Sequence, residues 1–175
     1  RADALMRKRA SVFGSGRNLL IRGELAMRTR TSSDDAGTVA DLAICARDTA
    51  LAAGDQSTEL SARILLLEES MSRGDLDRGL AELPAIDRLL HETVAAPRQG
   101  ARLSELRAHL LHKTGDYGAA EQVLREALED WEEGLREPER RRRLLTQLAE
   151  IMDHRGERGD ATLLRQEAER LRAPT

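Results

Sequence analysis

His109 and His112 are the residues of this sequence whose types and spacing could do chemistry. On a helix, a three-residue spacing puts both imidazoles on one face, and Glu105 lies a turn earlier, so a metal-binding pair is conceivable. A structural zinc site needs four ligands, however, and the single cysteine, Cys45, lies about sixty residues upstream. No His-Glu-x-x-His motif occurs. We therefore expect no metal and no cofactor, and interpret these side chains as solvated or groove-facing polar residues.

Four consecutive arginines, residues 140–143, could contact phosphate groups. They follow Glu137 and Glu139, and Arg–Glu pairs at helical spacing are common on exposed helix faces. We therefore predict a solvated face here. The first thirty residues hold eight Arg or Lys against two acidic residues, a net of +6 within a chain of net −3, which leaves −9 for the remainder. For this N-terminal excess too a solvated face is the main interpretation and an acidic partner the alternative, while the overall charge argues against direct nucleic-acid binding by this segment.

No arrangement of side chains in the sequence is typical of catalysis. Acidic pairs such as Glu68-Glu69 have no nucleophile or histidine arranged around them. Cys45 sits in an apolar stretch and is predicted to be a small buried residue rather than a nucleophile. Trp131 is predicted to pack in the core. We expect a protein that is not an enzyme.

Composition points to a helical protein that does not cross a membrane. The chain has 175 residues, of which 40% are hydrophobic, but one Phe, one Trp and one Tyr. The dominant residues, Ala, Leu, Glu and Arg, are strong helix formers. The apolar run Ile64–Leu67 is far shorter than the ~18 residues that would indicate a membrane span. A lone cysteine excludes an internal disulfide and fits a reducing cytoplasm.

Two further features of the sequence concern the origin of the protein. The sequence begins at Arg1, and we interpret it as a piece of a longer protein. Arginines outnumber lysines 26 to 2, which indicates a GC-rich bacterial genome.

The elements that must position these residues follow from a repeat. Gly74, Gly115 and Gly156 lie 41 residues apart. Positions five residues later hold small residues and positions twelve residues later hold small or medium apolar ones, namely Gly79, Ala120 and Ala161, then Ile86, Ala127 and Ala168. A fixed period in this range is the mark of stacked helical hairpins.

Turn and capping signals predict about nine helices and no strand. Pro84 should kink or break the helix that contains it. Residues 1–34 are predicted as a basic helical hairpin that starts the stack, and residues 35–175 as the repeats. The predicted helices span residues 2–12, 16–29, 35–53, 58–72, 76–92, 101–113, 117–134, 137–154 and 160–172, with residues 95–100 as a loop.

The run Gly115-Asp116-Tyr117-Gly118-Ala119-Ala120, followed by Leu124, Ala127 and Leu128, resembles the second helix of a tetratricopeptide repeat (TPR). In the last hairpin, the four positions that the family keeps apolar or small are Leu145, Leu148, Ala149 and Met152. The resemblance implies an all-α fold, a right-handed superhelix of antiparallel helix hairpins, in which Tyr117 fills the cleft between hairpins. The chain departs from the family in its longer period, in Arg63 and Arg107 at large apolar positions, and in Leu76 and Arg158 at the turn tyrosine.

A second, narrower resemblance is carried by residues 50–55, 61–66 and 73–76, which look like the helical-repeat regions of large bacterial ATP-binding regulators of the LuxR type. In those proteins an NTPase module and a DNA-binding module flank the repeats. Neither module occurs in this sequence, and Gly14-Ser15-Gly16-Arg17 lacks the lysine and the spacing of a phosphate-binding loop. The resemblance therefore implies the interaction portion of a larger transcriptional regulator.

The TPR resemblance implies a concave face, lined by the first helix of each hairpin, that binds a protein segment or a regulatory ligand. The alternative is self-association, in which exposed Leu-rich terminal helices dimerise a larger regulator. The implied groove residues are Arg102, Glu105, His109, His112 and Lys113 in the hairpin that turns at Gly115, Arg143, Thr146, Glu150 and Asp153 in the one that turns at Gly156, and Ser61, Ile64, Glu68 and Met71 in the one that turns at Gly74.

Overall fold

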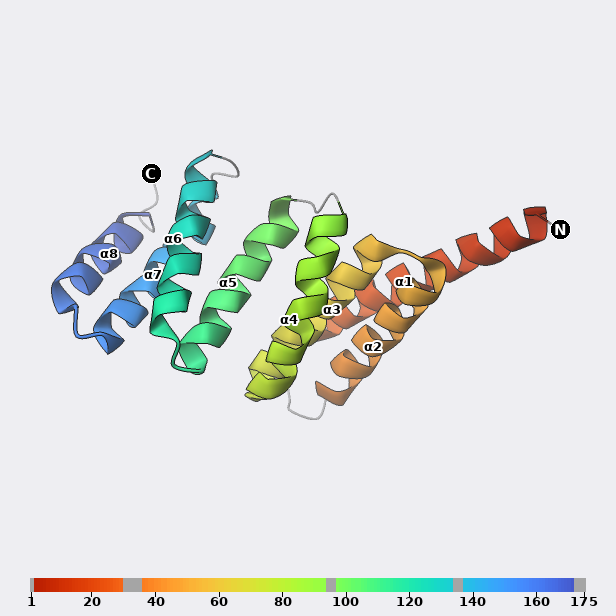
Figure 1. Cartoon of the computed structure of the whole chain (residues 1–175), viewed down its shortest axis with the longest axis horizontal. Helices are drawn as coiled ribbons and strands as arrows, with labels where there is room; N and C mark the ends of the chain where they lie inside the picture. Colours follow the sequence, from red (N-terminus) through yellow and green to blue (C-terminus); the bar gives the residue numbers. More distant parts are fainter. Residues whose placement is uncertain (1, 30–35, 94–96, 134–136, 172–175) are drawn as a thin grey trace. The chain divides into compact units, whose positions relative to one another are not determined.

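The fold is known from a computed structural model, which describes residues 2–29, 36–93, 97–133 and 137–171 (Figure 1). This part of the chain is all-helical and contains no strand, as predicted. It forms eight helices rather than nine: α1 (Ala2–Thr29), α2 (Ala36–Ala53), α3 (Gln56–Arg73), α4 (Leu76–Glu92), α5 (Pro97–Lys113), α6 (Tyr117–Glu133), α7 (Pro138–His154) and α8 (Arg158–Arg170).

The helices fall into two compact units. Unit 1 is Arg1–Ala95, with α1 to α4, and unit 2 is Ala96–Thr175, with α5 to α8. In unit 1 each helix packs on the next one in the chain, and α1 also packs on α3. In unit 2 each helix likewise packs on the next, and α5 also contacts α7. Each unit is thus a pair of successive helical hairpins, as the 41-residue period predicts.

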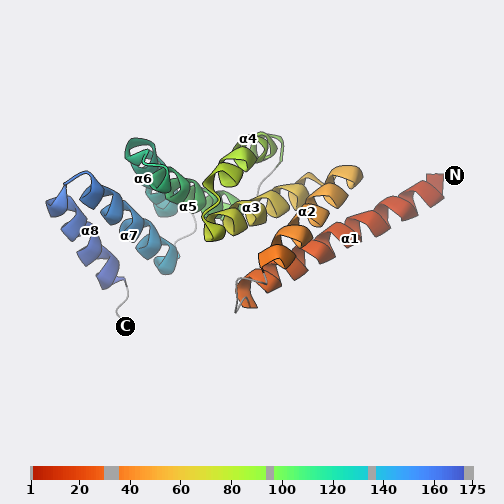
Figure 2. The same cartoon turned by 90° about the horizontal axis from the view of Figure 1, so that it is seen from below.

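The N-terminal segment differs from the prediction of two helices. Residues 2–29 form one continuous helix, whose first half extends beyond α2 in both views (Figures 1 and 2). Gly23 allows a close approach of α3, because a Cβ on Gly23 would lie 2.9 Å from Leu65 Cδ2, whereas a Cβ on Gly16 would make only ordinary contacts at 3.6 Å. The hairpin predicted for residues 1–34 is a single helix over its described residues.

Four glycines end helices in the left-handed backbone conformation, which L-residues adopt at a cost of about 1–2 kcal/mol. Their φ angles are 69° at Gly54, 74° at Gly74 and 85° at both Gly115 and Gly156. At Gly74, its own N–H donates to the Met71 carbonyl at 3.0 Å and the next N–H donates to the Ser70 carbonyl at 2.9 Å. The same pair of bonds occurs at all four turns, which is the Schellman pattern of helix termination.

The residue after the glycine is the N-cap of the next helix. The carboxylate of Asp55 accepts from the Thr58 backbone N–H at 3.1 Å, and Asp75 and Asp116 accept in the same way from Arg78 and Ala119. An aspartate in this position satisfies a helix N–H that has no partner in its own helix. At the fourth turn Glu157 makes no side-chain cap bond. A Gly-Asp pair therefore ends one helix and starts the next at three of the four turns.

The repeat predicted from the sequence has the expected burial. The small residues five positions after Gly74, Gly115 and Gly156 are buried, namely Gly79, Ala120 and Ala161. The apolar residues twelve positions after these glycines are buried as well, namely Ile86, Ala127 and Ala168. In unit 2 Ala120, Ala127 and Ala161 lie in one core cluster with Leu124 and Leu148. Small side chains at these positions let the helices approach closely.

Other boundaries refine the prediction. α4 runs through Pro84 without a break, so of the two predicted outcomes, a kink or a break, the break does not occur. α5 begins at Pro97, four residues before the predicted start, with proline at a first-turn position that needs no N–H bond. Residues 95 and 96 of the predicted loop, and the predicted end of the last helix at residue 172, lie outside the described residues.

Alanine substitutions at two nearby glycines should have opposite effects on stability. Gly115→Ala places a Cβ in the left-handed region and should lower the free energy of unfolding by about 1–2 kcal/mol. Gly118→Ala, three residues later inside α6, meets Asp116 Oδ1 only at 4.0 Å and should raise it by about 0.5–1 kcal/mol. Denaturant unfolding of both variants measures this, and equal effects would contradict the turn assignment.

Candidate functional site

One of the two sequence-predicted histidines of α5, His112, meets an aromatic side chain of α6 and a histidine of α7. The ring centroids of His112 and His154 are 5.0 Å apart in an edge-on arrangement. Tyr117 stacks on His154 with centroids 5.2 Å apart and an interplanar angle of 8°, and lies 5.6 Å from the His112 ring. We call these three residues, with His109 and Glu150, the His–Tyr cluster.

Local sequence explains why these side chains converge. His112 lies in the last turn of α5, and the Gly115 turn brings the chain back so that Tyr117 starts α6. His154 is the last residue of α7, which packs on α6. Three helix ends thus contribute one ring each. Tyr117 packs against the core of unit 2 as well as on His154.

The electrostatics of the cluster favour neutral imidazoles. Burial lowers the pKa of His109 below its usual 6.5, the positive charge of Lys113 lowers it further, and Glu150 opposes the shift. Burial also lowers the pKa of His112, together with the charge of His154, against an opposing contribution from Glu150 and with smaller lowering effects of Lys113 and His109. His109 and His112 therefore become positively charged only at a lower pH than an ordinary histidine.

The cluster offers several kinds of contact to a ligand. Neutral imidazoles and a phenol can stack and exchange hydrogen bonds, while Lys113 and Glu150 supply one charge of each sign. Within the described residues, no three His, Cys, Asp or Glu side chains are grouped so that they could hold a metal ion. The geometry suits a segment of polypeptide that has both charged and apolar side chains.

All four arginines at the start of α7, residues 140–143, form ion pairs with carboxylates. Arg140 is only 6% exposed, and its Nε lies 3.3 Å from Glu105 Oε1 on α5. The other three pair with carboxylates as well: Arg141 with Glu167 at 2.6 Å, Arg142 with Glu139 at 2.9 Å and Arg143 with Glu105 at 2.9 Å. The prediction of a solvated face is wrong for Arg140, because α5 packs beside this part of α7 and covers it.

Glu105 is therefore a structural residue as much as a groove residue. It neutralises two arginines of α7, one of them buried, and its hydrogen bond raises the pKa of Arg143 against the opposing effect of burial. Because each guanidinium of the run already faces a carboxylate, this surface offers no unpaired arginine cluster to a phosphate.

Unit 1 contains the remaining predicted groove residues. Ile64 is 1% exposed and so cannot contact a ligand; that prediction is wrong, because α3 is surrounded by α1, α2 and α4. Ser61, Glu68 and Met71 are partly exposed. Arg63, at a position where TPR proteins prefer an apolar residue, pairs with Glu59 at 2.9 Å and with Glu82 of α4 at 2.7 Å.

The other predicted groove residues of unit 2 differ in exposure and in the contacts that they make. Arg102, in the second turn of α5, and Lys113, its last residue, are both exposed. Thr146 donates its hydroxyl to the Arg142 carbonyl at 2.8 Å, and Asp153 forms an ion pair with Arg165 of α8.

Sequence reasoning missed Tyr117 and His154 as site residues. The available signal was position: His112 and His154 both lie two or three residues before a turn glycine.

The burial predicted for Cys45 is wrong, and the core packing predicted for Trp131 stays a prediction. Cys45 is exposed, not buried, because it lies on the same side of α2 as Asp41 and Asp48, while its apolar neighbours Ala43 and Ala46 face the core. The side chain of Trp131 lies outside the described part of the chain.

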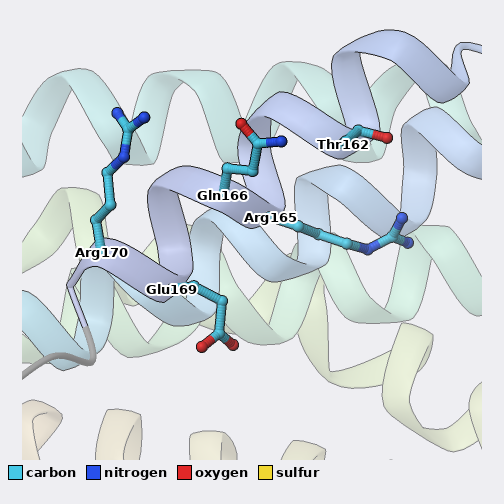
Figure 3. A pocket seen from close by; sticks show the side chains of 5 residues that line it. All are labelled: Thr162, Arg165, Gln166, Glu169 and Arg170. Carbon is cyan, nitrogen blue, oxygen red and sulfur yellow. The ribbon is translucent and has the colours of Figure 1, made fainter.

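A shallow hollow follows one side of α8 (Figure 3). The residues that line it are exposed, polar and spaced by three and four positions, namely Thr162, Arg165, Gln166, Glu169 and Arg170. All five come from a single helix, and Arg165 is already paired with Asp153. With no second element facing these side chains, the hollow lacks the converging polar groups of a ligand site.

Over the described residues, every helix is too short or too polar to pass through a bilayer. No protein-family model, no curated protein and no solved structure matches the chain.

Removing the charge of Glu105 should destabilise unit 2 strongly. Glu105→Gln leaves Arg140 buried without its counter-charge, and we expect a loss of about 3 kcal/mol in the free energy of unfolding. The matched control is Glu139→Gln, which breaks an exposed pair with Arg142 and should change stability by about 0–1 kcal/mol. Chemical denaturation of the two variants compares them, and similar losses would show that the Arg140–Glu105 pair has no special role.

The lowered pKa values of His109 and His112 predict a pH dependence of stability. A histidine whose folded pKa lies below the unfolded value binds its proton more readily in the unfolded chain, so stability is complete above about pH 6.5 and falls as the pH drops below it. His109→Gln/His112→Gln should reduce the loss between pH 7.5 and pH 5.5, measured by thermal unfolding. An unchanged loss would assign the dependence to other groups.

Proposed function

We propose that this chain is a non-catalytic, TPR-like binding module, in which exposed residues of α5 and α7 in unit 2 bind an acidic segment of a partner protein. The observation that supports this most directly is the His–Tyr cluster, which gathers rings and charges of three helices beside exposed Lys113. A single side chain would bind a peptide weakly, whereas a cluster offers stacking, hydrogen bonds and charge together.

The preference for an acidic segment rests on charge and spacing along α5. Arg102 and Lys113 are eleven residues apart, which corresponds to about 16 Å along a helix. Between them lie His109 and His112, three residues apart, which become cationic at low pH. An extended segment of about five residues spans the distance from Arg102 to Lys113, so its carboxylates can reach both side chains.

The wider setting rests on the two resemblances and on composition. A regulator of bacterial transcription, in which this module binds a protein or regulatory ligand, is the setting that the LuxR-type resemblance supports. A cytoplasmic location is proposed from the lone, unpaired cysteine.

Binding of designed peptides tests the proposal. The probes are a 12-residue peptide of alternating Glu and Leu and its counterpart with Lys in place of every Glu, titrated into the full chain by calorimetry. We expect the acidic peptide alone to bind, and more tightly at pH 6 than at pH 7.5, because protonation of His109 and His112 adds positive charge. Arg102→Glu/Lys113→Glu should weaken its binding at least about tenfold, or 1.4 kcal/mol.

The matched control is Arg158→Glu/Arg170→Glu, which makes the same charge change on exposed residues of α8 and should leave binding unchanged. Equal weakening in both double variants would show that net charge, not the α5 surface, decides binding. Absence of binding to the wild-type chain would contradict an acidic partner.

A further inference from the structure

The exposed side of α1 has the residue spacing of a seam between two helices. α1 packs on α2 and α3 and lies at the edge of unit 1 (Figure 2). Its buried glycines, Gly16 and Gly23, face these two neighbours. The opposite side is exposed at alternating four- and three-residue steps, and we call these residues the α1 seam, namely Gly14, Asn18, Ile21, Leu25 and Arg28. Such steps keep one row of side chains in line along a helix, as at the a and d positions of a coiled coil.

Two aliphatic side chains lie in solvent in the middle of the α1 seam. Ile21 and Leu25 are each 59% exposed. They are four residues apart, so they are neighbours on the helix surface, separated by about 6 Å along the axis. A partner that covered both would remove their apolar surface from water, which favours association.

Arginines flank this aliphatic pair. At about 100° per residue, Arg17 and Arg22 lie on opposite sides of the pair, and Arg28 continues the seam. All three are exposed, and within the described residues none of them forms an ion pair with a carboxylate. The arginines at residues 140–143 differ, since each of them is already paired. No exposed position of residues 14–29 is acidic, so these guanidinium groups are available to the carboxylates of a partner.

We propose that the α1 seam binds an amphipathic helix of a partner protein, one with aliphatic residues at three- and four-residue spacing and Glu or Asp on both sides of them. The aliphatic row of the partner covers Ile21 and Leu25, and its flanking carboxylates pair with Arg17 and Arg22. In coiled coils, charge pairs at these flanking positions determine which helices associate. This surface belongs to unit 1 and does not include the His–Tyr cluster.

The narrowness of the aliphatic row favours a helix over a lipid surface as the partner. Ile21 and Leu25 are separated by only about 40° around the helix axis. A helix that lies in a bilayer interface buries a broader apolar face, whereas a narrow row is typical of the seam between two helices. The net charge of −9 on residues 31–175 also opposes approach to an anionic bilayer.

Titration calorimetry of designed three-heptad peptides into the full chain tests the proposal. The Glu peptide has Leu at the a and d positions and Glu at the e and g positions, and the Lys peptide has Lys in place of each Glu. We expect the Glu peptide to bind and the Lys peptide not to bind, because only the first offers carboxylates to the arginines of α1. A Glu peptide with one central residue replaced by proline cannot form the continuous helix and should bind at least tenfold more weakly.

Variants of the α1 seam locate the site. Arg17→Glu/Arg22→Glu should weaken binding of the Glu peptide at least tenfold and should create binding of the Lys peptide. Ile21→Ser/Leu25→Ser should weaken binding of the Glu peptide at least tenfold, with the helicity of the chain unchanged in circular dichroism. The matched control for the aliphatic pair is Leu163→Ser, at a 64% exposed leucine of α8, which should keep the wild-type affinity.

Two charge variants of unit 2 separate this site from the proposed function of α5. Arg158→Glu/Arg170→Glu and Arg102→Glu/Lys113→Glu make the same charge change as the α1 variant and should keep the wild-type affinity for the Glu peptide. A loss in the α5 variant equal to that in the α1 variant would assign the peptide to unit 2 and overturn the α1 site. Absence of binding of the Glu peptide, or binding of phosphatidylserine vesicles in its place, would overturn a helical protein partner.

Discussion

The left-handed glycine at the end of four helices is the constraint on which the rest of this structure depends. Gly54, Gly74, Gly115 and Gly156 have φ angles that other residues adopt only with strain, and each closes its helix with the same two backbone hydrogen bonds. The turn that follows is short enough to bring the next helix back along the previous one. Because the three later turns recur every 41 residues, the positions that meet across each hairpin recur as well, and these are the small residues that allow close packing.

Charged residues occupy a third of the chain, and the structure uses many of them in pairs between helices. Arg140 and Arg143 of α7 share Glu105 of α5, and Arg63 of α3 lies between Glu59 and Glu82. A buried pair of this kind adds little net stability, but loss of one partner leaves a charge without water or counter-ion. These pairs therefore restrict how α5 and α7 can pack within unit 2, and they hold the end of α7 that lies away from the His–Tyr cluster.

The two units differ in the surface that they leave available. In unit 2, helix ends bring His112, Tyr117 and His154 together, with rings that stack but are not enclosed by the core. In unit 1, the outer sides of α1 and α2 alternate between arginine, aliphatic and aspartate side chains.

The helical class, the turn positions and the buried small residues could all be predicted from the sequence, because each follows from local chemistry. A glycine can end one helix, and the aspartate that follows it can cap the next helix, whatever surrounds them. A period of 41 residues places equivalent residues at equivalent contacts.

Burial could not be predicted in this way. Ile64 is covered because three helices surround α3, and Arg140 is covered because α5 lies beside α7. Cys45 is exposed because no described residue of unit 1 covers that side of α2. Likewise, Gly14 and Gly16 suggest a turn in the sequence, but both lie inside the continuous helix α1. His154 joins His112 through the packing of α7 against α5 and α6. Periodicity indicates which side of a helix is apolar, while the number and position of its neighbours decide which side is covered, and only the tertiary structure contains that information.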